Sequence, residues 1–187
     1  SDAGAKDPGD FTGGALRVLI VTAEVLSPLL DLTDFDTAIL FGDATSATVL
    51  YGESHCDRAQ ARVHRPKLSA RGDAGQTLSV PFLNDGYIKM KGQKVFAEAV
   101  RSMISSLNRT CRDRGIEVDD LKMIVPHQAN QRIIDAIQSR VAPTVFSNIR
   151  YHGNTSSTSI PLCLKDVLPM TAHGERVGLC AFGGGFT

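Results

Sequence analysis

The 187-residue sequence predicts an α/β fold built around a mostly parallel sheet. Apolar, partly β-branched runs typical of buried strands occur at 16–24, 121–126 and 176–182. Amphipathic helical patterns separate the later runs, and strands that alternate with helices form βαβ units on a parallel sheet. A chain of this length is sufficient for one substantial core or two small ones.

The first part of the chain is expected to hold strands and irregular segments. The run LRVLIVTAE (16–24) is almost continuously apolar, which is typical of a strand buried on both faces. Residues 37–52 predict two short strands around Gly42 and Asp43. Repeated Gly and Pro in 53–85 predict irregular structure with room for one strand, and residues 1–14 are expected to be a linker or a frayed end.

Helical periodicity begins after Met90. Apolar residues recur at three- and four-residue spacing from Phe96 to Leu107, with Arg101 and Arg109 on the other side. This pattern predicts an amphipathic helix that faces a core, and Gly115 is its expected stop.

A strand at 121–126 is then followed by a second helix. A further strand within 144–150, a helix near 156–168 and a last strand at 176–182 complete the expected order. The inner stripe of the second helix is expected to consist of Ala129, Ile133, Ala136 and Ile137.

Composition excludes several classes of function. Acidic and basic residues balance at 20 each, so no overall field favours nucleic acid or an anionic membrane. No apolar run approaches the length of a membrane span, and the first ten residues lack the charged-then-apolar order of a signal peptide. We therefore expect a soluble, cytoplasmic protein that binds neither nucleic acid nor membrane, although a mature secreted chain would look the same.

The four cysteines, Cys56, Cys111, Cys163 and Cys180, are scattered and form no C-x-x-C pair. This spacing predicts neither a metal site nor a disulfide framework. Free cysteine packs as a small hydrophobe, and none of the four is placed like an activated nucleophile.

Polar residues follow two of the predicted strands. His127 comes directly after the strand 121–126 and before a helix, at the sheet edge where ligands gather. The amides of a helix amino terminus disfavour a positive ring, so a neutral imidazole is expected. A structural histidine that caps a turn is the alternative.

Asn154 stands in the segment YHGNTSSTSIP (151–161), again between a strand and a helix. A neutral histidine and an asparagine amide are hydrogen-bond donors that can hold a developing oxyanion. A Gly-Asn turn followed by Ser/Thr capping is the simpler interpretation. The glycines of FGGGF (182–186) allow the backbone to approach a substrate, although such a tail is also commonly just flexible.

Four segments, FGDATSA (41–47), HQANQRI (127–133), HGNTSSTSIP (152–161) and AFGGGFT (181–187), resemble the β-ketoacyl-[acyl carrier protein] synthase III family of the thiolase superfamily. KMKGQKVFAEAV (89–100) resembles the helix that precedes the histidine strand in that family. The resemblance extends from about residue 12 to the last residue.

This resemblance implies a Cys-His-Asn site in an αβαβα-layered, usually homodimeric enzyme. Its cysteine takes an acyl group from acyl-CoA, and a malonyl thioester then loses carbon dioxide and condenses with it, without a further cofactor. Acyl-CoA and acyl carrier protein are the partners that the resemblance implies, and the preference between CoA and carrier protein stays open. By motif, His127 and Asn154 would bind the malonyl thioester oxygen, and the backbone N–H of Gly184 would bind the second oxyanion. Arg132 resembles a carrier-protein contact, and a solvated arginine is its alternative.

The sequence also departs from the family. The family's nucleophilic cysteine lies upstream of the strand that matches 16–24, and no cysteine here stands in for it. The expected fold is therefore an incomplete thiolase-like one, with the end of the N-terminal half in 1–85 and the C-terminal half in 86–187. This segment alone is expected to lack the nucleophile. Ala44 and Ser46 replace residues that are often glycine, which leaves the acyl substrate open.

Other functions are retained as alternatives. A ketosynthase III-like acyltransferase of secondary metabolism, with another acceptor, would use the same motifs. A non-catalytic ketosynthase-like subunit is disfavoured, because such a subunit has no need of the oxyanion donors His127 and Asn154. A nucleotide-binding domain is disfavoured because neither G-x-G-x-x-G nor a phosphate loop occurs.

Overall fold

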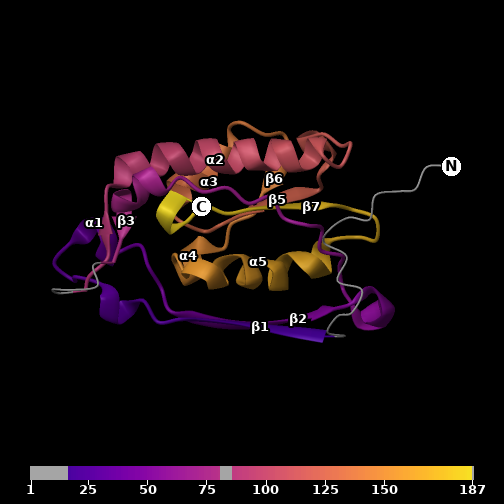
Figure 1. Ribbon diagram of the computed structural model, residues 1–187, viewed down its shortest axis with the longest axis horizontal. Coiled ribbons are helices and arrows are strands. Elements are labelled where there is room, and N and C mark those ends of the chain that lie inside the picture. Colours follow the sequence, from indigo (N-terminus) through magenta and orange to yellow (C-terminus); the bar gives the residue numbers. More distant parts are fainter. Residues whose placement is uncertain (1–16, 81–85, 187) are drawn as a thin grey trace.

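The computed structural model describes residues 17–80 and 86–186. Their elements stack in four layers (Figure 1). A pair of helices covers one face of a parallel sheet, a second pair covers the other face, and an antiparallel ribbon lies beyond the second pair. This order of helix, sheet, helix and strand layers agrees with the expected thiolase-like arrangement over the part of the chain that is described. No helix among these residues is long and apolar enough to cross a membrane.

The parallel sheet has the strand order β6-β5-β7. Its central strand β5 (Met123–Pro126) is buried along its whole length and pairs with β6 (Thr144–Val145) and β7 (Val177–Cys180). The register places Ile124 opposite Val145 on one side and opposite Gly178 on the other. The strands expected at 121–126 and 176–182, the strand expected within 144–150, and their parallel arrangement are confirmed, although β6 is only two residues long.

Helices α2 (Gly92–Arg112) and α3 (Gln131–Gln138) cover one face of the sheet. Helix α2 ends shortly before Gly115, as its periodicity predicts. Ala129 precedes α3 rather than lying in it, although it still packs against the core. The main core forms between these helices and the sheet, and its fully buried members include Met103, Ile124, Ile133 and Ile137.

Helices α4 (Ile149–His152) and α5 (Ser159–Val167) cover the other face of the sheet. Helix α5 is preceded by a 3-10 turn (Ser156–Thr158) and followed by another (Leu168–Met170). A smaller core forms here from Met123, Val125, Cys163 and Val167. The helix expected near 156–168 is therefore confirmed, with tightened ends.

Strand β1 (Arg17–Glu24) pairs antiparallel with β2 (Ala44–Tyr51) as a two-stranded ribbon. The expectation that 16–24 is buried on both faces is wrong for the described structure. Leu19 and Val21 are each 62 % exposed, and Val49 opposite Leu19 is also exposed. The reason is that, among the described residues, β1 has only β2 as a strand partner, and α5 with its preceding turn covers one side alone.

The prediction of a first strand in 37–52 is also wrong. This segment forms the short helix α1 (Phe35–Ala38), because the Asp34 carboxylate accepts a hydrogen bond from the N–H of Asp36 and caps it. Thr37 is fully buried and donates to the Asp34 carboxylate at 3.0 Å. Between α1 and β2, Phe41 makes an isolated strand-like bridge with Asn154.

Residues 53–80 are irregular, as expected, apart from short elements. The expected boundary between the two thiolase-like halves, after residue 85, falls at the end of 81–85, which lie outside the described residues. This boundary stays a prediction. The short elements of 53–80 are 3-10 turns at Glu53–Arg58 and Gly72–Thr77 and strand β3 (Leu78–Ser79), which pairs with β4 (Lys89–Met90). Elsewhere in the described residues, 3-10 turns lie at Ser27–Leu29, Val118–Asp120 and Gly184–Phe186.

The packing of α3 leads to a stability prediction. Ile137→Ala removes a side chain that is 0 % exposed and should lower the free energy of unfolding by about 2–5 kcal/mol, because a cavity remains. Leu68→Ala is the control, since Leu68 is 87 % exposed and its truncation should change little. Chemical denaturation of both variants measures the difference, and equal losses would contradict the assigned core.

Candidate active site

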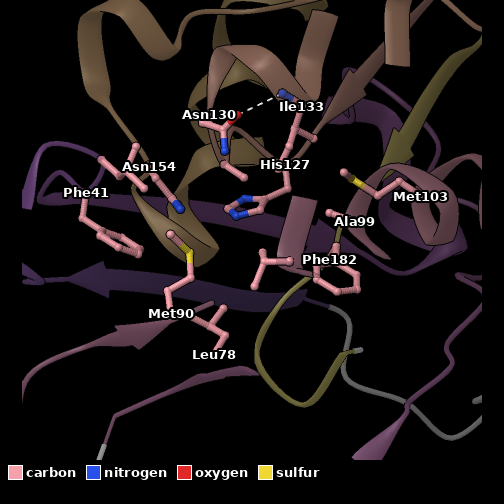
Figure 2. Close-up of a pocket in the computed structure, with 13 residues that line it drawn as sticks. Phe41, Leu78, Met90, Ala99, Met103, His127, Asn130, Ile133, Asn154 and Phe182 are labelled. Carbon is pink, nitrogen blue, oxygen red and sulfur yellow. Dashed lines mark hydrogen bonds between the residues drawn. The ribbon is translucent and has the colours of Figure 1, made fainter. Parts of the chain in front are cut away.

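A small pocket opens where the carboxyl end of β5 meets the loops that precede α5 and follow β7 (Figure 2). Its wall is largely apolar and includes Phe41, Met90 and Phe182. Two polar residues expected from the sequence, His127 and Asn154, both line it. In Figure 2 the His127 ring and the Asn154 amide nitrogen face each other across the pocket.

His127 is held by the sheet and by α5. Its backbone N–H donates to the carbonyl of Cys180 at 2.8 Å, which continues the pairing of β5 with β7. Its ring Nδ1 lies 2.7 Å from the hydroxyl oxygen of Ser159, the first residue of α5. Both attachments come from rigid elements, so they fix where the ring lies.

Gln128 ties the histidine loop to the neighbouring loop after β6. Its buried amide nitrogen donates to the carbonyl of Pro126 at 2.8 Å, and its amide oxygen accepts from the N–H of Asn148 at 3.1 Å. The roles of Gln128 and Ser159 are not evident from the sequence, because an amide after a histidine and a serine at a helix start both look like ordinary surface or capping residues.

Burial lowers the pKa of His127 to about 4. The ring is therefore neutral at physiological pH, as expected, but for a different reason. Helix α3 starts only at Gln131, and its amino terminus is capped by the side chain of Asn130, which accepts from the N–H of Ile133 at 2.9 Å. Loss of hydration, rather than helix amides, is thus the cause of the low pKa.

Asn154 is fixed by its backbone and by its own side-chain oxygen. Its N–H donates to the carbonyl of Leu40 at 2.8 Å, and its carbonyl accepts from the N–H of Gly42 at 3.0 Å. The side-chain Oδ1 accepts from the N–H of Ser156 at 3.0 Å. The turn expected as the simpler interpretation therefore forms, and because it uses Oδ1, it leaves the Nδ2 donor toward the pocket.

Two glycines allow these backbones to approach. A Cβ atom on Gly42 would lie 2.2 Å from the carbonyl oxygen of His152, which no side chain tolerates. Gly153 has a φ of 68°, and a Cβ there would meet the carbonyl oxygen of Leu40 at 3.2 Å. The glycines thus permit the bridge between Phe41 and Asn154.

Comparisons with known proteins identify the family of the chain. The family described as 3-oxoacyl-[acyl-carrier-protein] synthase III matches residues 11–72, and its C-terminal family matches residues 111–187. A β-ketoacyl-[acyl carrier protein] synthase III from Rhizorhabdus wittichii is 39 % identical over 94 % of this chain and 57 % of the relative. The chain belongs to the β-ketoacyl-[acyl carrier protein] synthase III family.

Solved structures give the same result for the fold. The synthase III of Thermus thermophilus matches with a TM-score of 0.80 and 34 % identity, over 94 % of this chain and 58 % of that one. The priming β-ketosynthase of the R1128 polyketide pathway matches with a TM-score of 0.72 and 27 % identity, over 92 % of this chain and 55 % of that one. The chain spans somewhat more than half the length of these synthase III relatives.

The glycine loop lies close to the pocket, but Gly184 does not line it. Gly184 is exposed, and a Cβ built on it would lie 3.9 Å from the backbone oxygen of Leu78, which is a pocket residue. Phe182 at the start of the loop does line the pocket. The oxyanion role expected for Gly184 from the synthase III resemblance stays a prediction.

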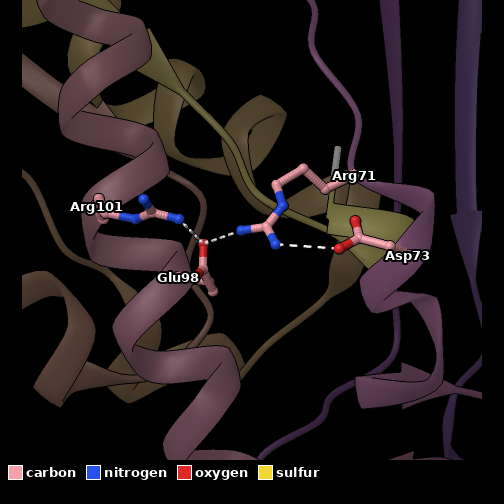
Figure 3. A network of polar contacts seen from close by, with 4 residues as sticks. All are labelled: Arg71, Asp73, Glu98 and Arg101. Atoms are coloured by element: carbon pink, nitrogen blue, oxygen red, sulfur yellow. Dashed lines mark hydrogen bonds and ion pairs between the residues drawn. The ribbon is translucent and has the colours of Figure 1, made fainter.

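An ion-pair network supports this loop from the side (Figure 3). The guanidinium of Arg71 contacts Asp73 at 3.2 Å and Glu98 on α2 at 3.4 Å, and Arg101 contacts Glu98 at 2.5 Å. The N–H of Arg71 donates to the carbonyl of Gly185 at 3.3 Å. The hydrogen bond from Arg101 also lowers the pKa of Glu98. The network therefore connects the glycine loop to α2.

Arg132 lies on the exposed side of α3, and its guanidinium carbon is 5.8 Å from the ring centre of Phe96. This stacking orients an otherwise solvated side chain. It is compatible with both interpretations of Arg132, and the carrier-protein contact stays a prediction.

The four cysteines carry no site of their own. Cys111, Cys163 and Cys180 are buried, Cys56 is exposed, and none lines the pocket. Burial raises the pKa of Cys163 and of Cys180 to about 12, so neither forms a thiolate at neutral pH. The described residues contain no group of three or more His, Cys, Asp or Glu placed to hold a metal ion.

The low pKa of His127 leads to a titration experiment. In NMR spectra the ring should stay neutral as the pH falls below 6.5 and should take up a proton only near pH 4. The unfolded chain binds that proton at its ordinary pKa, so this residue should lower the stability of the fold progressively between pH 6.5 and about 4. The variant His127→Gln identifies the resonance, and titration near pH 6.5 would contradict the assigned burial.

The close approach at Gly42 gives a second prediction. Gly42→Ala should lower the free energy of unfolding by about 1–3 kcal/mol, because its methyl group must displace the backbone next to Asn154. Gly72→Ala is the matched control, since a Cβ at Gly72 meets no atom within 4 Å. Thermal unfolding of both variants measures the effect, and an unperturbed Gly42→Ala protein would refute the tight clamp.

Proposed function

We propose that the protein containing this chain is a β-ketoacyl-[acyl carrier protein] synthase III-type acyltransferase. It joins an acyl group from acyl-CoA to a malonyl thioester by decarboxylative Claisen condensation and releases a 3-oxoacyl product for fatty-acid biosynthesis. The observation that carries the proposal is the pair of donors, His127 and Asn154, which face each other across one largely apolar pocket. Family membership supports the same reaction.

The two donors act in the decarboxylation. When the malonyl group loses carbon dioxide, the electron pair of the broken C–C bond passes into the thioester and places negative charge on its oxygen. A neutral imidazole N–H of His127 and the Nδ2–H of Asn154 donate hydrogen bonds to that oxygen and stabilise the enolate. Both groups are uncharged donors held in place beforehand, so little reorganisation is needed when the charge develops.

The condensation then consumes the enolate. Its α-carbon forms a bond to the carbonyl carbon of the enzyme-bound acyl group, the C–S bond to the enzyme breaks, and the thiolate leaves. The acyl-carrying thiolate that the family implies is not one of the four cysteines of this chain, because none lines the pocket. Apolar side chains of Phe41, Leu78 and Met90 favour a hydrocarbon acyl group.

The proposal also covers the carrier protein, the second oxyanion and the assembly of the enzyme. Arg132 contacts the acidic carrier protein that delivers the malonyl group, and the backbone N–H of Gly184 binds the oxyanion of the acyl carbonyl. The enzyme acts as a cytoplasmic homodimer and needs no cofactor besides its thioester substrates. The exposed position of Arg132 supports its role as a carrier-protein contact, and the proximity of Gly184 to the pocket residue Leu78 supports its role at the oxyanion.

A second candidate is a ketosynthase III-like acyltransferase of secondary metabolism. The similarity to the priming β-ketosynthase of a polyketide pathway favours it, as do Ala44 and Ser46 at positions that are often glycine. The same donor pair serves both candidates. Rates with malonyl carrier protein and with other acyl acceptors distinguish them, since the fatty-acid enzyme condenses its starter with malonyl carrier protein and the second candidate uses another acceptor.

The proposal predicts separate effects on the two steps, measured in the complete protein. His127→Ala and Asn154→Asp should each slow release of carbon dioxide from the malonyl thioester by about 100- to 1000-fold, because each removes an oxyanion donor. Asn154→Asp also places a carboxylate near the enolate and the His127 ring, which raises the pKa of His127. Transfer of labelled acyl groups to the protein should persist.

The control is His173→Ala, which removes an exposed histidine that does not line the pocket. It should leave both steps unchanged. If His127→Ala and Asn154→Asp released carbon dioxide at the parental rate, both side chains would be structural and the proposed reaction would lose its support.

A further inference from the structure

The hydroxyl group of Ser159 contacts the side of the His127 ring that faces away from the pocket. Its oxygen lies 2.7 Å from the ring Nδ1, which is hydrogen-bonding distance. Ser159 is only 2 % exposed, so water does not compete for this contact. Two orientations are possible, since either the hydroxyl or the ring nitrogen can be the donor, and they leave opposite protons on the imidazole.

The other contacts of Ser159 select one orientation. Its oxygen also accepts a long hydrogen bond, of 3.4 Å, from the backbone N–H of Gln128. Its hydrogen then needs an acceptor, because a buried hydroxyl donor without one is costly. Among the described residues, the one acceptor within hydrogen-bonding distance of the hydroxyl is Nδ1 of His127. The favoured arrangement is therefore a hydroxyl that donates and a ring nitrogen that accepts.

The hydroxyl is held where it can do this. Ser159 begins α5, and the 3-10 turn before it is attached to strand β1 at two points. The hydroxyl of Thr158 donates to that of Thr22 at 2.8 Å, and the N–H of Ser157 donates to the Glu24 carboxylate at 3.2 Å. These bonds limit rotation of the first turn of α5 and keep the serine in line with the ring.

We propose that Ser159 is a positioning residue that fixes His127 as the tautomer with its proton on Nε2. This inference rests on the proposed function, in which His127 must offer an N–H to the malonyl thioester oxygen. With Nδ1 occupied as an acceptor, Nε2 is the ring nitrogen left for the pocket, and it carries the hydrogen that the enolate needs. Without Ser159 the neutral ring divides between two tautomers, and one of them presents a lone pair to the enolate.

The tautomer is measured directly in the complete protein by nitrogen-15 NMR of the histidine rings near pH 7. Wild-type His127 should show a protonated Nε2 and an unprotonated Nδ1. Ser159→Ala should move both signals toward the average of the two tautomers, while Ser147→Ala, which removes an exposed hydroxyl bonded to Gln131, should leave them in place. A wild-type Nδ1 that carries the proton, or an unchanged spectrum in Ser159→Ala, would overturn the inference.

Kinetics provide the second readout. Ser159→Ala should lower kcat for carbon dioxide release by about 3- to 10-fold, the change expected for loss of one hydrogen bond of ordinary net strength. KM for the malonyl thioester and acyl transfer to the protein should stay near parental values, as they should in Ser147→Ala. An unchanged kcat in Ser159→Ala would count against the positioning role.

The two proposals fail in different ways. A wild-type protein that shows the expected tautomer but releases no carbon dioxide would refute the proposed function and leave the hydrogen bond of Ser159 intact. A protein in which His127→Ala abolishes decarboxylation while Ser159→Ala changes neither the spectrum nor kcat would support the function and refute the role of Ser159.

Discussion

The parallel pairing of β5 with strands on both sides is the constraint on which the rest of the structure depends. Ile124 and Val125 are fully buried between helices on the two faces, so this strand has no freedom to shift or tilt. The hydrogen bond from the backbone N–H of His127 to the carbonyl of Cys180 extends the pairing of β5 with β7. It therefore fixes the backbone of His127 at the edge of the pocket. A hydrogen-bond donor on such an element is already in position, so little further conformational entropy is lost when the reaction occurs.

Much of the fold could be predicted because its signals are local and periodic. The three-and-four spacing in α2 and the short apolar run of β5 each specify one element, and the rule that ligands gather at the carboxyl ends of parallel strands brings His127 and Asn154 together. The first expected strand of 37–52 was wrong because a capping carboxylate at Asp34 outweighed the apolar pattern. The prediction that both faces of β1 are buried was wrong, because an apolar sequence does not reveal which elements cover the strand.

The parts of the site that sequence could not predict are those made by contacts between distant segments. Ser159 and Gln128 belong to common residue types, and their importance comes only from the ring or loop that folding places against them. The reason for the neutral histidine was also missed, since burial is a property of the assembled pocket and not of the residues beside His127 in the chain. Asn154 combines two roles that looked like alternatives, because its oxygen makes the turn while its nitrogen serves the pocket.

The burial of the thiols has a practical consequence for chemical labelling. Cys163 and Cys180 are shielded from solvent, and their raised pKa values keep them in the unreactive protonated form, while Cys111 is buried and its pKa is raised by burial as well. Cys56 alone among the four is exposed. A maleimide dye applied to the folded chain therefore marks a single known position, and slow appearance of further modified cysteines reports opening of the core.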